Sequence, residues 1–244
     1  MLKAWGMTDI GLVRRENQDA YRFCEQKGHM VAVVCDGMGG AAGGQVASRI
    51  AVETFTSELE KIMTETMSPE QLREASSYAV AMANRAIGEV AKQQEAYQHM
   101  GTTLVSAVSC GEEVVVSNVG DSRAYHICPA GITRITKDHS LVESMVDRGD
   151  ITAEEARHHP KRNLITRALG ADADAQCDGY ICHVEAGDFI LLCTDGLVDT
   201  VTDQEMLFEI LHGGEPETCL DRLLAIAKQQ GAPDNVTGIL LQKL

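Results

Sequence analysis

The sequence lacks the features that would place the protein in a membrane, in a secretory pathway or on nucleic acid. No apolar run approaches the ~18 residues that a membrane-spanning helix needs, and the N-terminus shows no signal peptide. Basic residues are few, because 21 Lys and Arg stand against 36 Asp and Glu, which gives a formal charge of −15. An acidic surface does not attract nucleic acid or anionic lipid. These absences predict a cytoplasmic protein with neither kind of partner.

Closely spaced cysteines are also missing, although the chain has eight cysteines. It contains no CxxC pair and no Cys/His spacing typical of a zinc site, and the isolated His126 has no partner at a telling distance in the sequence. Cys35 and Cys193 lie within apolar runs and are typical of small core residues. We therefore expect a reducing compartment. Internal repeats, low-complexity tracts and linkers are absent as well, so residues 1–244 are predicted to form one domain.

The central stretch of the chain is an apolar run, residues 30–35, that ends abruptly in Asp36. The chain then becomes glycine-rich, beginning with Gly37. A β-branched run bounded by glycines predicts a buried strand. A carboxylate at the end of such a strand is held by a rigid element but faces a loop, where chemistry usually takes place.

The same pattern recurs along nearly the whole chain. Four more aspartates stand at the ends of predicted strands, and we hypothesise that the fold brings all five together. They are Asp19, Asp36, Asp121, Asp195 and Asp234.

The remaining pattern predicts an α+β protein with antiparallel sheet. Links between the strands in the middle of the chain are too short for parallel crossovers, which need about a dozen residues, so this region is predicted to be an antiparallel meander. Residues 138–170 are polar and rich in His and Arg, which is typical of a surface flap. Helices are predicted at 45–63, 68–92, 140–148, 152–157, 206–211 and 218–228, and strands at 5–10, 21–24, 30–35, 102–108, 114–119, 124–128, 132–135, 180–184, 189–193 and 236–241.

Aspartates without histidine or cysteine partners suit hard cations such as Mg²⁺ or Mn²⁺. Gathered in one cleft, they would repel one another strongly unless dications were bound. Two such ions held by bridging carboxylates lower the pKa of a water and clamp phosphoryl oxygens. Arg14, close to Asp19, could supply a fork for phosphate. The chemistry indicates metal-assisted hydrolysis of a phosphate ester.

A second motif competes with this interpretation. Residues 37–42 fit GxGxxA, between a predicted strand and a predicted helix, as in a dinucleotide-binding turn. Against it, Asp36 would face the pyrophosphate with its own negative charge, and the later links predict antiparallel pairing instead of βαβ units.

Eight short blocks, in order, resemble the type 2C (PPM) metal-dependent protein serine/threonine phosphatases in their short bacterial form. The blocks span residues 9 to 237 and are 9–19, 36–40, 101–103, 118–123, 138–142, 163–170, 194–197 and 234–237. The resemblance implies a four-layer α-β-β-α sandwich, in which helices flank two antiparallel sheets and the metals lie in a cleft at one edge.

The resemblance also implies roles for individual residues. Asp36 would bridge two Mn²⁺ or Mg²⁺ ions, Asp195 and Asp234 would complete one site, and Asp19 with the backbone carbonyl of Gly37 would complete the other. Arg14 would hold the substrate phosphate. A third, weaker metal site would use Asp121, Asp195 and Asp199.

As a family expectation, the chain hydrolyses phosphoserine and phosphothreonine in proteins in one step, with a metal-activated water and no phosphoenzyme. It would oppose a bacterial serine/threonine kinase and act as a monomer, with the flap helping to choose substrates.

Two departures from the family pattern bear on the mechanism. Met38 stands where many eukaryotic members have a histidine proposed as general acid, and Gln18 stands where some members have glutamate. The proton donor is therefore open between water and another group, with His158 and His159 as candidates, while His139 is more typical of a turn-orienting residue. A phosphoprotein-binding pseudoenzyme is the alternative from another class, disfavoured because the aspartates remain.

Overall fold

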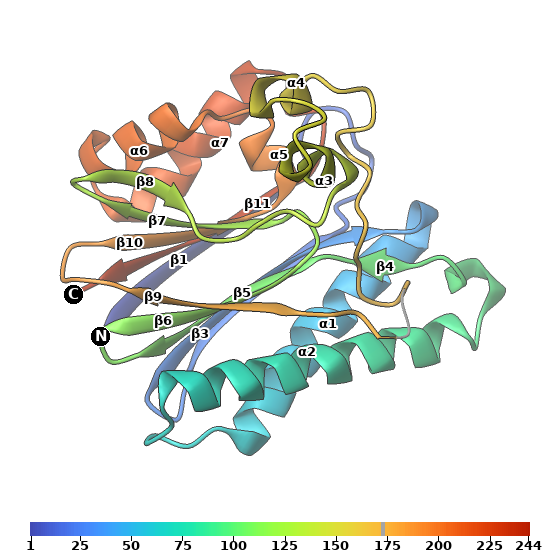
Figure 1. The fold of residues 1–244 in the computed structure, drawn as a ribbon, viewed down its shortest axis with the longest axis horizontal. Coiled ribbons are helices and arrows are strands. Elements are labelled where there is room, and N and C mark those ends of the chain that lie inside the picture. The colour runs from blue at the N-terminus through green and yellow to red at the C-terminus, as the bar shows by residue number, and fades with distance from the viewer. Residues whose placement is uncertain (172–173) are drawn as a thin grey trace.

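Two antiparallel sheets, packed face to face, form the centre of the molecule in a computed structural model that describes residues 1–171 and 174–244 (Figure 1). Every strand pairing in this part of the chain is antiparallel, which excludes the βαβ arrangement of a dinucleotide-binding domain. The first sheet has the order β1 (Leu2–Asp9), β11 (Val236–Lys243), β10 (Phe189–Cys193), β7 (Arg123–Cys128) and β8 (Gly131–Arg134). The second has the order β2 (Asp19–Gln26), β3 (His29–Met38), β5 (Leu104–Cys110), β6 (Glu113–Val119) and β9 (Asp178–His183), with β4 (Gly101–Thr102) paired to β3.

Helices cover the outer face of each sheet, which confirms the predicted four layers (Figure 1). Helices α1 (Gly40–Ile62) and α2 (Pro69–Ala91) pack on the second sheet, and α6 (Asp203–His212) and α7 (Cys219–Gln229) pack on the first. The short elements are α5 (Asp195–Val198), η1 (Glu95–Tyr97) and η2 (Pro216–Thr218).

Strand β3 shows why its sequence is a continuous apolar run. Alternate side chains of a strand point to opposite faces. Val31, Val33 and Cys35 therefore pack under α1 and α2, while Ala32 and Val34 pack between the two sheets. All five are fully buried, so a polar residue at any of them would lose its hydration.

The predicted start of α2 is confirmed in detail. Ser68 caps the helix by accepting a hydrogen bond from the Gln71 amide, and the Gln71 side chain accepts one from the Ser68 amide at 2.9 Å. Pro69 occupies the first turn, where its missing N–H costs nothing.

Two details of the predicted sheet are wrong. Residues 102–108 do not form one strand, because Thr103 separates β4 from β5. The middle of the chain is not a single meander either, because β6 pairs with β9 whereas β7 pairs with β10 in the other sheet. The link at 120–122 therefore passes from one sheet to the other, a choice that short link length alone does not reveal.

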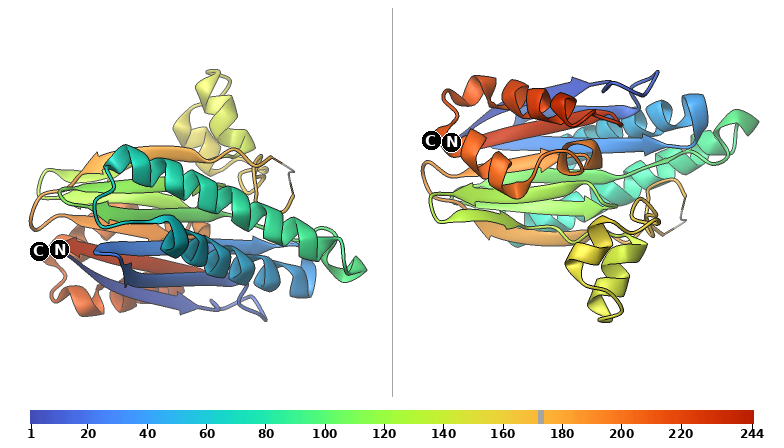
Figure 2. Two further views of the ribbon diagram at one scale, coloured as in Figure 1. Left: turned by 90° about the horizontal axis from the view of Figure 1, so that it is seen from below. Right: turned by 90° about the horizontal axis from the view of Figure 1, so that it is seen from above.

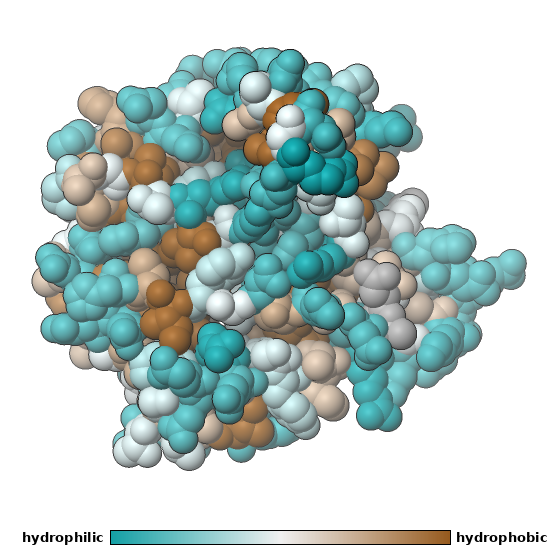
Figure 3. Space-filling view, viewed as in Figure 1, coloured by the Kyte–Doolittle hydropathy of each residue, from teal (hydrophilic) through white to brown (hydrophobic). Residues whose placement is uncertain are grey.

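The segment 138–170 projects beyond the edge of the sandwich and carries α3 (Leu141–Asp147) and α4 (Ala153–Arg157) (Figure 2). A bridge between Ser140 and Ile165 joins the two ends of the segment to each other, and a bridge between Thr102 and Leu169 ties it to the body. The predicted short helices of this segment are thus present. The molecular face in Figure 3 is mostly hydrophilic, with hydrophobic residues in small scattered groups. Among the described residues, no helix combines the length and apolarity needed to cross a membrane.

Candidate metal centre

The aspartates that the sequence singled out come from both sheets and meet at one end of the sandwich. Asp19 begins β2 and stands directly opposite Asp36 in the β2–β3 register. Asp195 follows β10 and opens α5, and Asp234 precedes β11, the neighbour of β10. The charges of Asp19, Asp195, Asp121 and Asp234 all act on Asp36, so the structure brings the five together as hypothesised.

Threonines clamp the backbone around Asp36. Its amide donates to the hydroxyl of Thr103 at 2.9 Å, and its carbonyl accepts from the Thr103 amide at 2.9 Å and from the Thr102 hydroxyl at 2.8 Å. The break between β4 and β5 supplies these groups. A Cβ on Gly37 would lie 2.1 Å from the carbonyl oxygen of Gly44, so α1 can approach the strand only because residue 37 is glycine.

Asn235 holds the loop that carries Arg14 and Asp19. Its side-chain nitrogen, Nδ2, donates to the backbone carbonyls of Ile10 at 2.9 Å and Glu16 at 3.0 Å. Its side-chain oxygen, Oδ1, accepts from the backbone amide of Gln18 at 2.9 Å. Sequence reasoning gave this residue no role. The only signal was its place directly after Asp234.

Two carboxylate oxygens in this cluster have no hydrogen-bond partner among the described residues. They are Oδ1 of Asp19 and Oδ1 of Asp195, both shielded from solvent. The other oxygen of Asp19 accepts from the Thr194 hydroxyl at 3.0 Å. Buried polar atoms are normally paired, and unpaired carboxylate oxygens are the donors that hard cations bind. The residues present therefore fit Mg²⁺ or Mn²⁺.

The pKa values of four aspartates in the cluster are raised. Burial, followed by repulsion from neighbouring carboxylates, raises the pKa of Asp19 to about 7, of Asp195 to about 6 and of Asp121 to about 8. The pKa of Asp36 rises well above its ordinary value for the same reasons. Without a cation, the folded chain therefore retains protons in this cluster that free aspartates would release.

A cavity of about 310 Å³ opens beside the cluster and is lined by residues of four segments. Arg14 lies in it and donates from Nη2 to Oδ2 of Asp234 at 2.5 Å, and this hydrogen bond raises the Arg14 pKa. The flap contributes Arg162, whose Nε lies 3.7 Å from Oδ2 of Asp199. The residues around the cavity are Val13, Arg14, Arg162, Asn163, Asp195, Gly196, Asp199, Pro233 and Asp234.

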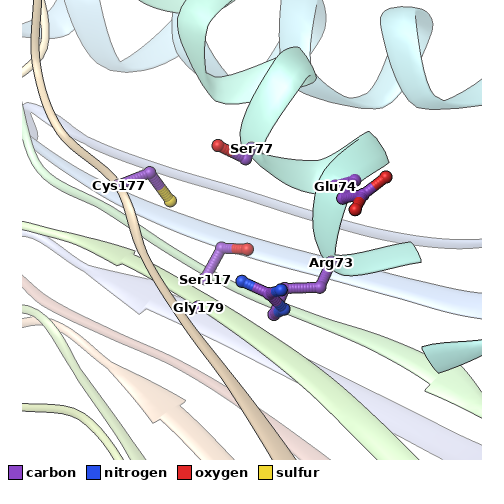
Figure 4. Close-up of a pocket in the computed structure, with 6 residues that line it drawn as sticks. All are labelled: Arg73, Glu74, Ser77, Ser117, Cys177 and Gly179. Atoms are coloured by element: carbon purple, nitrogen blue, oxygen red, sulfur yellow. The ribbon is translucent and has the colours of Figure 1, made fainter. Parts of the chain in front are cut away.

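A second cavity, of about 220 Å³, lies between α2 and the second sheet (Figure 4). Arg73, Glu74 and Ser77 enter it from α2, and Ser117 and Cys177 face them. None of the clustered aspartates lines it, so it is not part of the candidate centre.

The histidines of the family blocks and of the flap stand in different surroundings. His139 accepts from the Gly120 amide at 3.0 Å through Nδ1, and its Nε2 lies 3.1 Å from Asp178, so it positions the turn that carries Asp121. His158 lies 3.3 Å from Glu154 on the exposed side of α4 and is not among the residues around the cavity.

Arg123 and Asp138 form an ion pair that sequence reasoning missed. The Arg123 guanidinium donates from Nε at 3.0 Å and from Nη2 at 2.6 Å to the buried carboxylate of Asp138. This two-point contact joins the first residue of β7 to the start of the flap. It lies next to the link at 120–122, which carries Asp121.

Known proteins agree with this geometry. Residues 14–225 match the family model described as Protein phosphatase 2C. The serine/threonine phosphatase stp of Listeria monocytogenes is 34% identical over 97% of this chain and 94% of its own length.

Solved structures give the same result. Stp1 from Staphylococcus aureus superposes with a TM-score of 0.94 at 36% identity, covering 100% of this chain and 96% of that one. The catalytic domain of PstP in complex with 2 manganese ions superposes with a TM-score of 0.86 at 32% identity, over 99% and 97% of the two chains. The matched structures are serine/threonine phosphatases, and the family model and the relative both span most of this chain. This chain belongs to the protein phosphatase 2C family.

The carboxylate cluster predicts an unusual pH dependence for the metal-free protein. The folded-state pKa values of about 6 to about 8 exceed the unfolded value near 3.8, so the folded state binds more protons in between. Stability is therefore greatest at acid pH and is lost as the pH rises from about 4 to about 8. In EDTA at pH 8, Asp36→Asn should raise the melting temperature by at least about 4 °C, and in millimolar Mn²⁺ the order should reverse.

Thermal unfolding followed by circular dichroism checks this, with Asp221→Asn, on the first turn of α7 and away from the cluster, as the matched control. A variant that is less stable than the parent in both buffers would contradict the charge argument.

Proposed function

We propose that the chain hydrolyses phosphoserine and phosphothreonine in proteins, with Mn²⁺ or Mg²⁺ bound in the aspartate cluster. The observation that carries the proposal is the pair of unpartnered, buried oxygens on Asp19 and Asp195, in a cluster that also holds Asp36. The cavity of about 310 Å³ beside this cluster has room for a phosphate and is lined by the Arg14 guanidinium, which supports the same function.

The proposed centre holds two ions per chain. Asp36 would be a ligand of both, Asp195 and Asp234 would complete one site, and Asp19 with the carbonyl of Gly37 would complete the other. Asp36 is central to this arrangement, since the charges of the other aspartates converge on it. When bound, such ions supply Lewis acidity, which lowers the pKa of water and stabilises charge on phosphoryl oxygens.

Arg14 has two partners that compete for it. In the structure it neutralises Asp234 across 2.5 Å, and its side chain is 55% exposed at the cavity. Cations on the cluster would neutralise Asp234 in its place. The guanidinium would then be free to present its planar fork to a phosphate, the geometry for which arginine is best suited.

The flap borders the same cavity, which supports a role in selecting substrates. Arg162 and Asn163 line it together with Arg14, so a phosphopeptide bound there would contact the flap. Residues 1–244 form one domain in this proposal, because both sheets share a buried layer and the flap is tied to the body. The proton that the leaving alkoxide needs would come from water, since no histidine is among the residues around the cavity.

The proposed reaction also implies partners. The substrates are phosphorylated proteins, a bacterial serine/threonine kinase is the opposing enzyme, and the chain acts as a monomer in the cytoplasm. Light scattering on the purified chain tests the monomer, because a mass of twice 26.4 kDa would contradict it. Removal of phosphate from an autophosphorylated bacterial kinase tests the partner.

The first prediction concerns turnover. The purified chain should release phosphate from a phosphothreonine peptide in Mn²⁺, and Asp36→Asn should lower kcat/KM by more than about 100-fold. EDTA should lower the activity of the parent to the same extent, and added Mn²⁺ should restore it. Phosphate release in a colorimetric assay is the measurement.

The pseudoenzyme alternative gives the opposite outcome. A folded chain that binds the phosphopeptide in Mn²⁺ but releases no phosphate would establish it. Asp221→Asn again serves as the control, because its charge change is the same and its position lies outside the cluster.

The second prediction separates phosphate binding from metal binding. Arg14→Ala should raise KM for the phosphopeptide by about 10-fold or more, because a charge-assisted contact to phosphate is lost. Manganese affinity should not fall, since Asp234 is released from its ion pair. Steady-state kinetics and Mn²⁺ titration calorimetry give the two numbers, and Arg15→Ala is the neighbouring control. A fall in Mn²⁺ affinity with an unchanged KM would refute the role assigned to Arg14.

The third prediction concerns the additional ion at Asp121, Asp195 and Asp199. Arg162 lies against Asp199, so an ion at this site must compete with the guanidinium. Counting bound Mn²⁺ by equilibrium dialysis should give three ions at high Mn²⁺ for the parent and two for Asp121→Asn, and Arg162→Gln should bind the third ion more tightly. Three ions retained in Asp121→Asn would rule out this site.

A further inference from the structure

A second group of metal-ligating side chains lies at the opposite end of the sandwich from the aspartate cluster. It consists of His126 and Cys128 on β7 and Asp188 just before β10. The chain termini lie at the same end, since Leu2 pairs with Lys243 and Phe189 with Gln242 (Figure 1). Neither the turnover reaction nor the family blocks involve these residues.

Strand register accounts for the grouping. His126 and Cys128 are two positions apart on one strand and so share a face. Phe189 pairs with Ile127, which brings the preceding residue, Asp188, level with Cys128. One ligand atom from each of the three residues lies within 4.8 Å of the others, and Nε2 of His126 is 2.8 Å from Oδ2 of Asp188.

The position of Asp188 is set before any ligand binds. Its carboxylate accepts from the Glu185 amide at 3.0 Å, and its backbone carbonyl accepts from the Lys243 amide at 2.9 Å. The residue is buried, whereas His126 and Cys128 are half-buried. A cation would therefore meet a rigid carboxylate and two accessible donors.

A fourth donor approaches from the other sheet. Cys182 lies on β9 and packs against the layer between the sheets. Three residues further along the chain, the Glu185 amide donates to the Asp188 carboxylate at 3.0 Å, so the end of β9 lies beside the group.

We propose that His126 Nε2, Cys128 Sγ and the Asp188 carboxylate bind one borderline transition-metal cation of the zinc(II) class, with Cys182 as the fourth ligand. Mixed nitrogen, sulfur and oxygen donors in a four-ligand set favour Zn²⁺, whereas Mg²⁺ and Mn²⁺ prefer oxygen alone. On binding, each thiol releases its proton to solvent, and the His126–Asp188 hydrogen bond is replaced by bonds to the ion.

Such an ion would join the two sheets. Its ligands would come from β7 and the start of β10 in one sheet and from β9 in the other. Because folding assembles the site, the ion would stabilise the folded chain and leave the distant aspartate cluster unaltered.

Cobalt(II) titration of the reduced, metal-stripped full-length chain tests the proposal. Thiolate-bound Co²⁺ gives a sulfur-to-metal charge-transfer absorption in the near ultraviolet, which the oxygen ligands of the aspartate cluster cannot give. We expect this absorption to saturate at one equivalent and to disappear when Zn²⁺ is added. The variants His126→Gln and Cys128→Ser should weaken binding by at least about 10-fold.

Two controls keep the outcome clear. Cys110→Ser changes another half-buried cysteine, on β5, and should keep the absorption. Asp36→Asn removes a ligand from the other centre and should keep it as well.

Absence of the absorption in the parent chain would overturn the proposal without any variant. Its persistence in folded His126→Gln and Cys128→Ser, judged by circular dichroism, would do the same. Because the readout is independent of phosphate release, failure of this site and failure of the proposed phosphatase function are distinguishable.

Discussion

Mutual repulsion among carboxylates that the fold forces together is the constraint on which the rest of this structure depends. Both sheets contribute, because β2 and β3 bring Asp19 and Asp36 into one pair while β10 and β11 place Asp195 and Asp234 next to them. Burial and repulsion act in the same direction on Asp19, Asp36 and Asp195, so the pKa of each lies above the ordinary value of aspartate unless a cation is present. The hydrophobic layers must therefore supply enough free energy to hold together a cluster that opposes folding. A bound dication removes the repulsion between the carboxylates, and this gain in free energy adds to its binding affinity.

Holding such a cluster requires backbone contacts that leave the carboxylate oxygens free. Thr102 and Thr103 bind the main chain of Asp36, and Asn235 binds three main-chain groups of the loop that precedes Asp19. Glycine serves the same purpose by a different route, since a side chain at Gly37 would collide with α1. In this way the scaffold uses polar groups on the backbone and reserves the acidic side chains, two oxygens of which remain unpaired, for the ions.

Much of this arrangement could be predicted from the sequence, and the limits have a common cause. Continuous apolar runs gave β10 with its observed bounds, and the Ser68–Pro69 pair located the start of α2, because both signals are local. The aspartates were also found from a local signal, their position at the ends of predicted strands. What failed were contacts that depend on strand register or on the choice of sheet. The short link at 120–122 predicts one meander, but it crosses between the sheets. The sequence shows no partner for His126, but Asp188, which lies 62 residues later and just before β10, is 2.8 Å away. Sequence spacing carries no information about such pairs.

The two ends of the sandwich then present different donor sets to metal ions. At one end the donors are carboxylates, which suit hard cations. At the other end an imidazole, thiols and a single carboxylate would select a softer ion from the same solution. The sheets that separate the two sets are buried and close-packed, so an ion at one end contacts no ligand of the other. A chain with both sets could therefore use one kind of ion for chemistry and another to hold its sheets together. The chemical type of the ligands alone is enough to make each site prefer a different ion.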